Sequence, residues 1–322
     1  MGTVTCARLA LLITVSLGMA SAGCARPPGA APAQAAPPAG AARVLTVAGA
    51  RLRVDTGNGD FSAGNEVLYG WVSRAARIVA AYYGMFPNPE VTIELRAMPG
   101  AGVQGGSTYA DPHALIRMRV GREVTAAQLT SDWVMVHEMT HLALPDVGEQ
   151  HAWLSEGLAT YVEGIERVQA GNRTEQDVWE EELRSMPRGL PQEGDAGLDH
   201  THTWGRTYWG GAMFCLLADV DIRRRTHNAR GLQDALRAIL RASGGLKTEW
   251  PIERVLHTGD AAVGTTSLEE LYARMKDAPY APDLMAVWRE LGVEPDGDGV
   301  RLTDAAPLAE ARHAIMAAHP GS

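Results

Sequence analysis

Cysteine is scarce in this sequence: the 322-residue chain contains only Cys6, Cys24 and Cys215, which allow few disulfide bonds. Cys6 lies in an N-terminal stretch that we expect to be removed, so no disulfide framework is indicated. Cys215, within "AMFCLLA", is interpreted as a buried free thiol. The chain also lacks a Lys/Arg-rich stripe and carries a net charge of −9 at pH 7, so we expect no nucleic-acid partner.

Residues 1–23 are predicted to be an export signal. Arg8 is followed by an uncharged apolar run that is too short for a membrane span and ends in small residues. Residues 20–22 form an A-x-A-like cleavage site, which would give a periplasmic or secreted protein. "SAGC" instead resembles a bacterial lipoprotein box with lipid on Cys24. We favour this membrane anchor in the cell envelope, because it explains a lone cysteine at the mature N-terminus.

Residues 24–42 are an Ala/Pro/Gly-rich segment that cannot bury a core and is predicted to be an extended tether. No internal repeat follows it. A mixed α/β region is expected after the tether, with strands at 43–56 (a pair broken at Ala48-Gly49), 90–98, 102–110 and 114–120, and a helix at 65–84.

The rest of the chain is predicted to be largely helical. A helix over 125–144 begins at the N-cap Thr125 and ends before Pro145. Further helices are expected at 151–168 and 203–226, separated by a polar loop with a short helix. After Asn228 helical patterns dominate, at 231–243, 267–277, 282–292 and 307–319. We therefore expect a catalytic domain over 43–226 and a helical C-terminal subdomain over 227–322.

Residues 133–144, "WVMVHEMTHLAL", carry His137, Glu138 and His141 inside an apolar run. Composition alone would produce one His-Glu-x-x-His by chance only about 0.02 times in this chain. Residues at i and i+4 share one helix face, so both imidazoles can bind zinc. Glu138 is rotated by about 100° from His137 and borders the metal, which suits a general base for a metal-associated water. The alternative is a histidine pair satisfied within the core.

A catalytic zinc usually has a third protein ligand. Several acidic residues follow the motif and leave the identity of this ligand open, among them Asp146, Glu149, Glu156 and Glu163. The longer metzincin pattern fails, because Leu144 and Val147 stand where its glycine and third histidine should be. A carboxylate from a second helix is the remaining common solution.

"HEMTH" followed by "WLSEGLATYVE" resembles the gluzincin metallopeptidases, especially aminopeptidase N-like and glycyl aminopeptidase-like enzymes. The resemblance covers roughly residues 110–240. It implies an α+β zincin (thermolysin-like) catalytic domain with a small N-terminal sheet, active-site helices and a helical C-terminal part. It also implies zinc-dependent hydrolysis of peptide or protein substrates, with Glu156 as the third ligand. "TYWGGAMFCLLADVDIRRRT" is similar to a helix of this family whose tyrosine, Tyr208 here, stabilises the transition state.

The resemblance has a gap that affects the expected specificity. The G-x-M-E-N strand, which in aminopeptidases recognises a free amino terminus, is missing, and "GVQGGSTYA" occupies a comparable place without an acid. We therefore favour endopeptidase or relaxed activity over strict aminopeptidase action. The alternative function is a catalytically inactive, surface-anchored binding module that keeps the peptidase fold. Its hallmark would be loss of Glu138 or a ligand, and none is lost.

Several other residues receive simpler interpretations. His151, His200 and His202 could line the cleft, but we favour the interpretation that they are solvated loop histidines. Glu163, two turns after Glu156 on the same helix face, is either a surface acid or a partner of a ligand histidine. "DGDG" at 296–299 does not fit an EF-hand and is expected to be a turn. Gly210-Gly211 would allow the backbone to pass close to another element.

Overall fold

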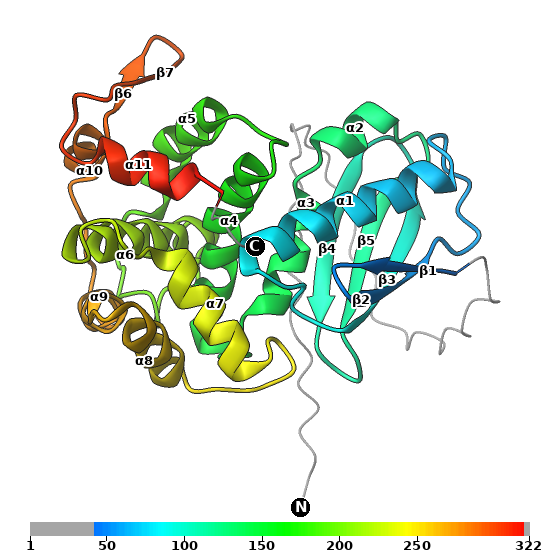
Figure 1. Ribbon diagram of the computed structural model, residues 1–322, viewed down its shortest axis with the longest axis horizontal. Coiled ribbons are helices and arrows are strands. Elements are labelled where there is room, and N and C mark those ends of the chain that lie inside the picture. Colours follow the sequence, from blue (N-terminus) through cyan, green and yellow to red (C-terminus); the bar gives the residue numbers. More distant parts are fainter. Residues whose placement is uncertain (1–41, 319–322) are drawn as a thin grey trace, which may run out of the picture.

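The computed structural model of the protein describes residues 42–318, so the predicted signal segment, Cys24 and most of the tether lie outside the described residues. A five-stranded sheet occupies the N-terminal part, and the remainder is mainly helical (Figure 1). The mixed α+β class with a small N-terminal sheet and a helical C-terminal part is therefore confirmed. Among the described residues, no helix combines the length and the apolar character that crossing a membrane requires.

The sheet has the order β1-β2-β3-β5-β4. Its strands are β1 (Arg43–Val47), β2 (Ala50–Asp55), β3 (Glu90–Met98), β4 (Val103–Tyr109) and β5 (Leu115–Gly121). The predicted break at Ala48-Gly49 is a tight turn, in which both residues have positive φ (46° and 81°). The β1–β2 and β4–β5 pairs are antiparallel, whereas β3 pairs in parallel with both β2 and β5. This order leaves β4 at an edge of the sheet.

Helix α1 (Asn65–Tyr83) confirms the prediction from its apolar periodicity, and it ends at Gly84 in the left-handed conformation (φ 78°). It packs against α3 and α4, the two helices that carry the predicted metal ligands. Figure 1 shows α1 extending from in front of the sheet towards the helical part.

The prediction of a single helix over 125–144 is wrong. Thr125 does cap a helix, with a reciprocal bond pair to Gln128, but this helix, α2, covers only Ala126–Ser131. Asp132 interrupts it by accepting hydrogen bonds from the backbone of Val134 (3.2 Å) and Met135 (3.1 Å). These amides are the unpaired donors of a new helix start, so the chain begins again as α3 (Val134–Thr140). A 3₁₀ turn, His141–Ala143, follows.

The helices after residue 150 largely follow the sequence pattern. They are α4 (Ala152–Gln169), α5 (Glu175–Ser185), α6 (Gly211–Arg225), α7 (Leu232–Ser243), α8 (Ile252–Val263), α9 (Ser267–Met275), α10 (Leu284–Leu291) and α11 (Ala309–Met316). The structure adds α8, which was not predicted, and a hairpin of β6 (Val293–Asp296) and β7 (Gly299–Leu302). "DGDG" forms the turn of this hairpin, as expected.

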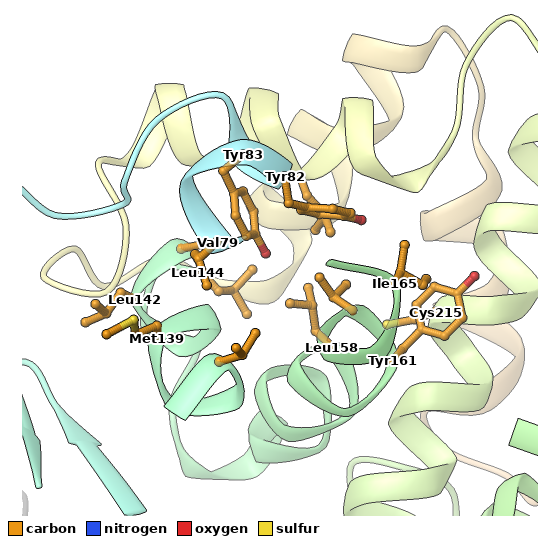
Figure 2. Close-up of a cluster of buried hydrophobic side chains, with 14 of the residues drawn as sticks. Val79, Tyr82, Tyr83, Met139, Leu142, Leu144, Leu158, Tyr161, Ile165 and Cys215 are labelled. Carbon is orange, nitrogen blue, oxygen red and sulfur yellow. The ribbon is translucent and has the colours of Figure 1, made fainter. Parts of the chain in front are cut away.

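The helices that carry the predicted site residues pack closely against one another. Figure 2 shows buried side chains of α1, α3, α4 and α6 in one cluster, including Tyr83, Met139, Leu158 and Cys215. Cys215 is a buried free thiol, as predicted. Helices α4 and α6 cross at Gly157 and Gly211, where a Cβ on Gly157 would lie 2.2 Å from the Gly211 backbone. The expected close approach at the second glycine of the Gly210-Gly211 pair is confirmed.

Candidate metal centre

The structure brings together the three residues that the sequence singled out as metal ligands. One potential ligand atom each of His137, His141 and Glu156 lies within 4.8 Å of the other two. His137 and Glu156 come from α3 and α4, and His141 begins the 3₁₀ turn that extends α3. Asp146, Glu149 and Glu163, the other candidate ligands, do not belong to this group.

The spacing of these atoms fits a zinc ion. Glu156 Oε2 lies 3.4 Å from His137 Nε2 and 3.5 Å from His141 Nε2. Ligands bound tetrahedrally at 2.0–2.1 Å are separated by about 3.3 Å, so the observed distances match those across a zinc coordination sphere. They are longer than typical charge-assisted hydrogen bonds of about 2.8 Å. Two imidazoles and one carboxylate are also a common donor set for catalytic zinc.

His141 is oriented by the residue that precedes Glu156. Its Nδ1 lies 3.0 Å from Ser155 Oγ, which leaves Nε2 directed at Glu156. Such a contact fixes the ring orientation of a ligand histidine. The sequence analysis did not identify Ser155, although its position inside "WLSEG", next to the proposed ligand, was a usable signal.

The two histidines change the ionisation of Glu156. Burial alone would raise the pKa of its carboxyl group, but His141 and His137 outweigh this effect, and the pKa lies well below its usual value. The two histidines thus favour the ionised carboxylate, which is the form that binds a metal.

Glu138 is buried (7% exposed) beside the three candidate ligands and faces the edge strand β4. The Thr108 hydroxyl lies 2.7 Å from Glu138 Oε2 and 2.8 Å from the Glu138 carbonyl oxygen. A Cβ at Gly106 would lie 2.5 Å from Glu138 Cγ, so only glycine fits there without moving the acid. Strand β4 therefore positions the predicted base. Thr108 was not predicted, because the contact joins residues 30 positions apart.

Tyr208 lies in a π-helical turn, Gly205–Gly210, immediately before α6. Its ring stacks on His137 with centroids 6.4 Å apart and an interplanar angle of 18°. Burial raises the pKa of the phenol, and the charge and hydrogen bonding of Glu156 raise it further, so the hydroxyl keeps its proton. The structure thus places a neutral donor beside the three candidate ligands, in a type of turn that is frequent at functional sites.

Two of the simpler interpretations need correction. His151 is not a solvated loop residue, because its Nδ1 lies 3.1 Å from the buried carboxylate of Asp199. Glu163 is neither a surface acid nor bonded to a ligand histidine: it is buried and pairs with Arg167 at 2.7 Å.

His200 and His202 are exposed, as expected. His137 Nδ1 is buried, and none of the described residues forms a hydrogen bond with it.

Comparison with protein-family models and with curated proteins found no match. Solved structures do resemble the chain. An aminopeptidase N family protein from Idiomarina loihiensis has a TM-score of 0.57 at 13% identity, over 83% of this chain and 53% of that one. An M1 zinc metallopeptidase from Deinococcus radiodurans, also solved with a Tyr-Ser-Ala substrate, has a TM-score of 0.49 at 16% identity, over 72% of this chain and 50% of that one. The chain spans about half the length of these proteins, and its fold is that of the aminopeptidase N family structures.

Proposed function

We propose that the protein is a zinc-dependent metallopeptidase with a zincin (thermolysin-like) catalytic domain. The observation that carries the proposal is the convergence of His137, His141 and Glu156 at zinc-ligand spacing, with Glu138 buried beside them. The aminopeptidase N fold supports the same interpretation.

Each residue has a defined task in this reaction. His137, His141 and Glu156 would hold the zinc, which when bound supplies Lewis-acid polarisation of the substrate carbonyl and a more acidic water. Glu138, held by Thr108, takes the proton from the attacking water and later delivers it to the departing amine. Tyr208 keeps its proton and can donate a hydrogen bond to the developing oxyanion.

The edge strand β4 supports a preference between the two cleavage modes. An extended substrate can pair with the open side of β4 through main-chain hydrogen bonds. Strand β4 contains no acid that could bind a substrate ammonium group. We therefore favour endopeptidase or relaxed activity over strict aminopeptidase action.

The experiment that tests the function is hydrolysis of a peptide library by the zinc-loaded protein. Each peptide is offered with a free and an acetylated amino terminus, and Glu138→Gln serves as the inactive control. We expect the wild type to cleave both forms and Glu138→Gln to cleave neither. Binding without turnover by the wild type would contradict the proposal and support the inactive binding module. Loss of all cleavage on acetylation would indicate an aminopeptidase.

We also propose that the chain is exported and anchored by lipid on Cys24. The support is sequence alone: the lipoprotein-like box and the tether that follows it. Intact mass of the native mature protein tests this. An N-terminal Cys24 with added acyl mass is expected, and an unmodified start at another residue would contradict the anchor.

A further inference from the structure

A cavity of about 470 Å³ adjoins the candidate metal centre, with His137 and Tyr208 in its wall. Two large aromatic side chains, Trp133 and Trp204, also line it and remain 39% and 44% exposed. Trp133 meets the His137 ring edge-on at 5.6 Å, and Trp204 stacks on Tyr208 at 5.8 Å. A substrate held at the metal would therefore have this cavity beside its reacting bond.

Four charged side chains of the cavity wall form ion pairs with each other, whereas the buried Glu182 forms none among the described residues. Glu163 is matched by Arg167 at 2.7 Å, and Glu181 is matched by Arg173 at 2.7 Å. Glu182 on α5 is only 4% exposed, and no hydrogen bond from the described residues reaches its Oε2 atom. Arg188, also in the wall, is exposed and screened by solvent.

Leaving Glu182 unpaired is costly in the free protein. Burial raises the pKa of its carboxyl group well above the usual value, Glu181 and Glu163 raise it further, and Arg173 opposes them. The other titratable groups that interact with it are Tyr161 on α4 and Cys215 on α6, and neither is cationic. Buried polar groups are normally hydrogen-bonded, so an acid in the wall of a cavity, without a partner among the described residues, is a candidate for contacting a ligand.

The side chains that line the cavity indicate which kind of ligand it would bind. Tryptophan faces pack well against the methylene chain of a lysine or arginine and attract its cationic end. We propose that this cavity binds a lysine or arginine side chain of the substrate, next to the scissile bond, with Glu182 as its counter-ion. This inference rests on the proposed peptidase function for the identity of the ligand. Glu182 is then a specificity-determining residue.

The test uses internally quenched peptides in which one position at a time carries arginine, norleucine or glutamate. Norleucine keeps an unbranched apolar side chain but lacks the charge. We expect the wild type to cleave at least one arginine series roughly tenfold or more faster, in kcat/KM, than its norleucine counterpart. Glu182→Gln should reduce this ratio to near one. Glu180→Gln, on the same helix but outside the cavity wall, should leave the ratio unchanged.

Calorimetry separates failure of this inference from failure of the proposed function. In the zinc-loaded Glu138→Gln protein, which keeps the metal but should not cleave peptide, arginine peptide should bind more tightly than norleucine peptide, with release of a proton as Glu182 ionises. Adding Glu182→Gln to this protein should abolish both effects. If no peptide is cleaved but these binding differences persist, the function fails and the cavity assignment stands. Equal cleavage and binding of the two peptides would overturn the inference, as would a preference for glutamate. Thermal unfolding of Glu182→Gln serves as the folding control, and it should match the wild type because glutamine has nearly the same shape as the protonated acid.

Discussion

Among single residues, Tyr208 has the most specific expected role, because only its hydroxyl group is expected to act in catalysis. The ring is fixed by stacking on His137 and Trp204, while the hydroxyl reaches Glu156. Tyr208→Phe keeps the ring and removes only the donor. We expect kcat to fall by about 10²–10³, with a much smaller change in KM, because the hydrogen bond strengthens in the transition state.

Zinc content and thermal unfolding provide the control for this variant. Both should match the wild type, because the phenylalanine ring retains the packing of Tyr208. Near-normal kcat in Tyr208→Phe would return the tyrosine to a packing role.

The sequence could identify part of the site at this scale. His137, Glu138 and His141 share one local segment, so helical spacing was enough to predict their convergence. Glu156 was only one of several candidate acids until the resemblance selected it. Thr108 and Glu182 depend on contacts between elements far apart in the chain, and no local pattern encodes such contacts.

At the scale of elements, the approach of β4 to α3 sets the position of the base. A methyl group at Gly106 would collide with Cγ, Cδ and Oε1 of the Glu138 side chain, which can rotate away more readily than a backbone segment can. Gly106→Ala should therefore lower kcat by at least tenfold while changing the unfolding temperature little, as measured by steady-state kinetics and thermal denaturation.

The α4–α6 crossing provides the matched comparison. At Gly157 the colliding atoms belong to the backbone of Gly211 and cannot swing away. Gly157→Ala should cost about 1–3 kcal/mol of unfolding free energy or more. Equal effects of the two substitutions on stability would show that the side chain facing Gly106 is no easier to displace than the backbone facing Gly157.

Glu166 on α4 makes the contact between α3 and α4 sensitive to pH. It accepts a hydrogen bond from Thr140 (3.0 Å), and its other oxygen has no hydrogen-bond partner among the described residues. Burial raises the pKa of this carboxyl group well above its usual value; the Thr140 bond opposes the shift and Glu163 adds to it. The folded protein therefore holds a proton that the unfolded chain releases near pH 4–5.

The sign of the effect follows from that difference. Stability from the protonated group is complete below the unfolded pKa and declines as pH rises towards the folded pKa. Glu166→Gln does not titrate. Its stability relative to wild type should increase between pH 5 and 7 by up to about 1.4 kcal/mol per pH unit, measured by urea unfolding. A pH-independent difference would mean that Glu166 is ionised in the folded protein.

Elements were predicted well where one physical signal dominated. The strands alternate, and α1 combines strong periodicity with a terminal glycine, so both were predicted within a few residues. The break between α2 and α3 was missed because Asp132 lies within a continuous helical pattern and acts through its side chain. Helix α8 was missed although its buried residues Ile252, Val255, Leu256 and Val263 recur at helical spacing, so a local signal was available in the sequence. The β6–β7 hairpin joins two strands of only four residues each, which give little periodicity to detect.

At the scale of the whole molecule, the sheet and the helices meet at the candidate zinc centre. Strand β4 supports Glu138, and the turn before α6 contributes Tyr208. The three candidate ligands come from α3, the 3₁₀ turn that follows it, and α4. We propose that this junction is a zinc site in which Glu156 is a ligand and Glu138 is the base.

The zinc content and zinc affinity of purified variants test these two roles. The wild type should bind about one zinc per chain, and Glu138→Gln should bind zinc with the same affinity while losing turnover. Glu156→Gln should weaken zinc binding markedly, because it removes an anionic ligand. Unchanged zinc affinity in Glu156→Gln, or loss of zinc in Glu138→Gln, would contradict the assignment.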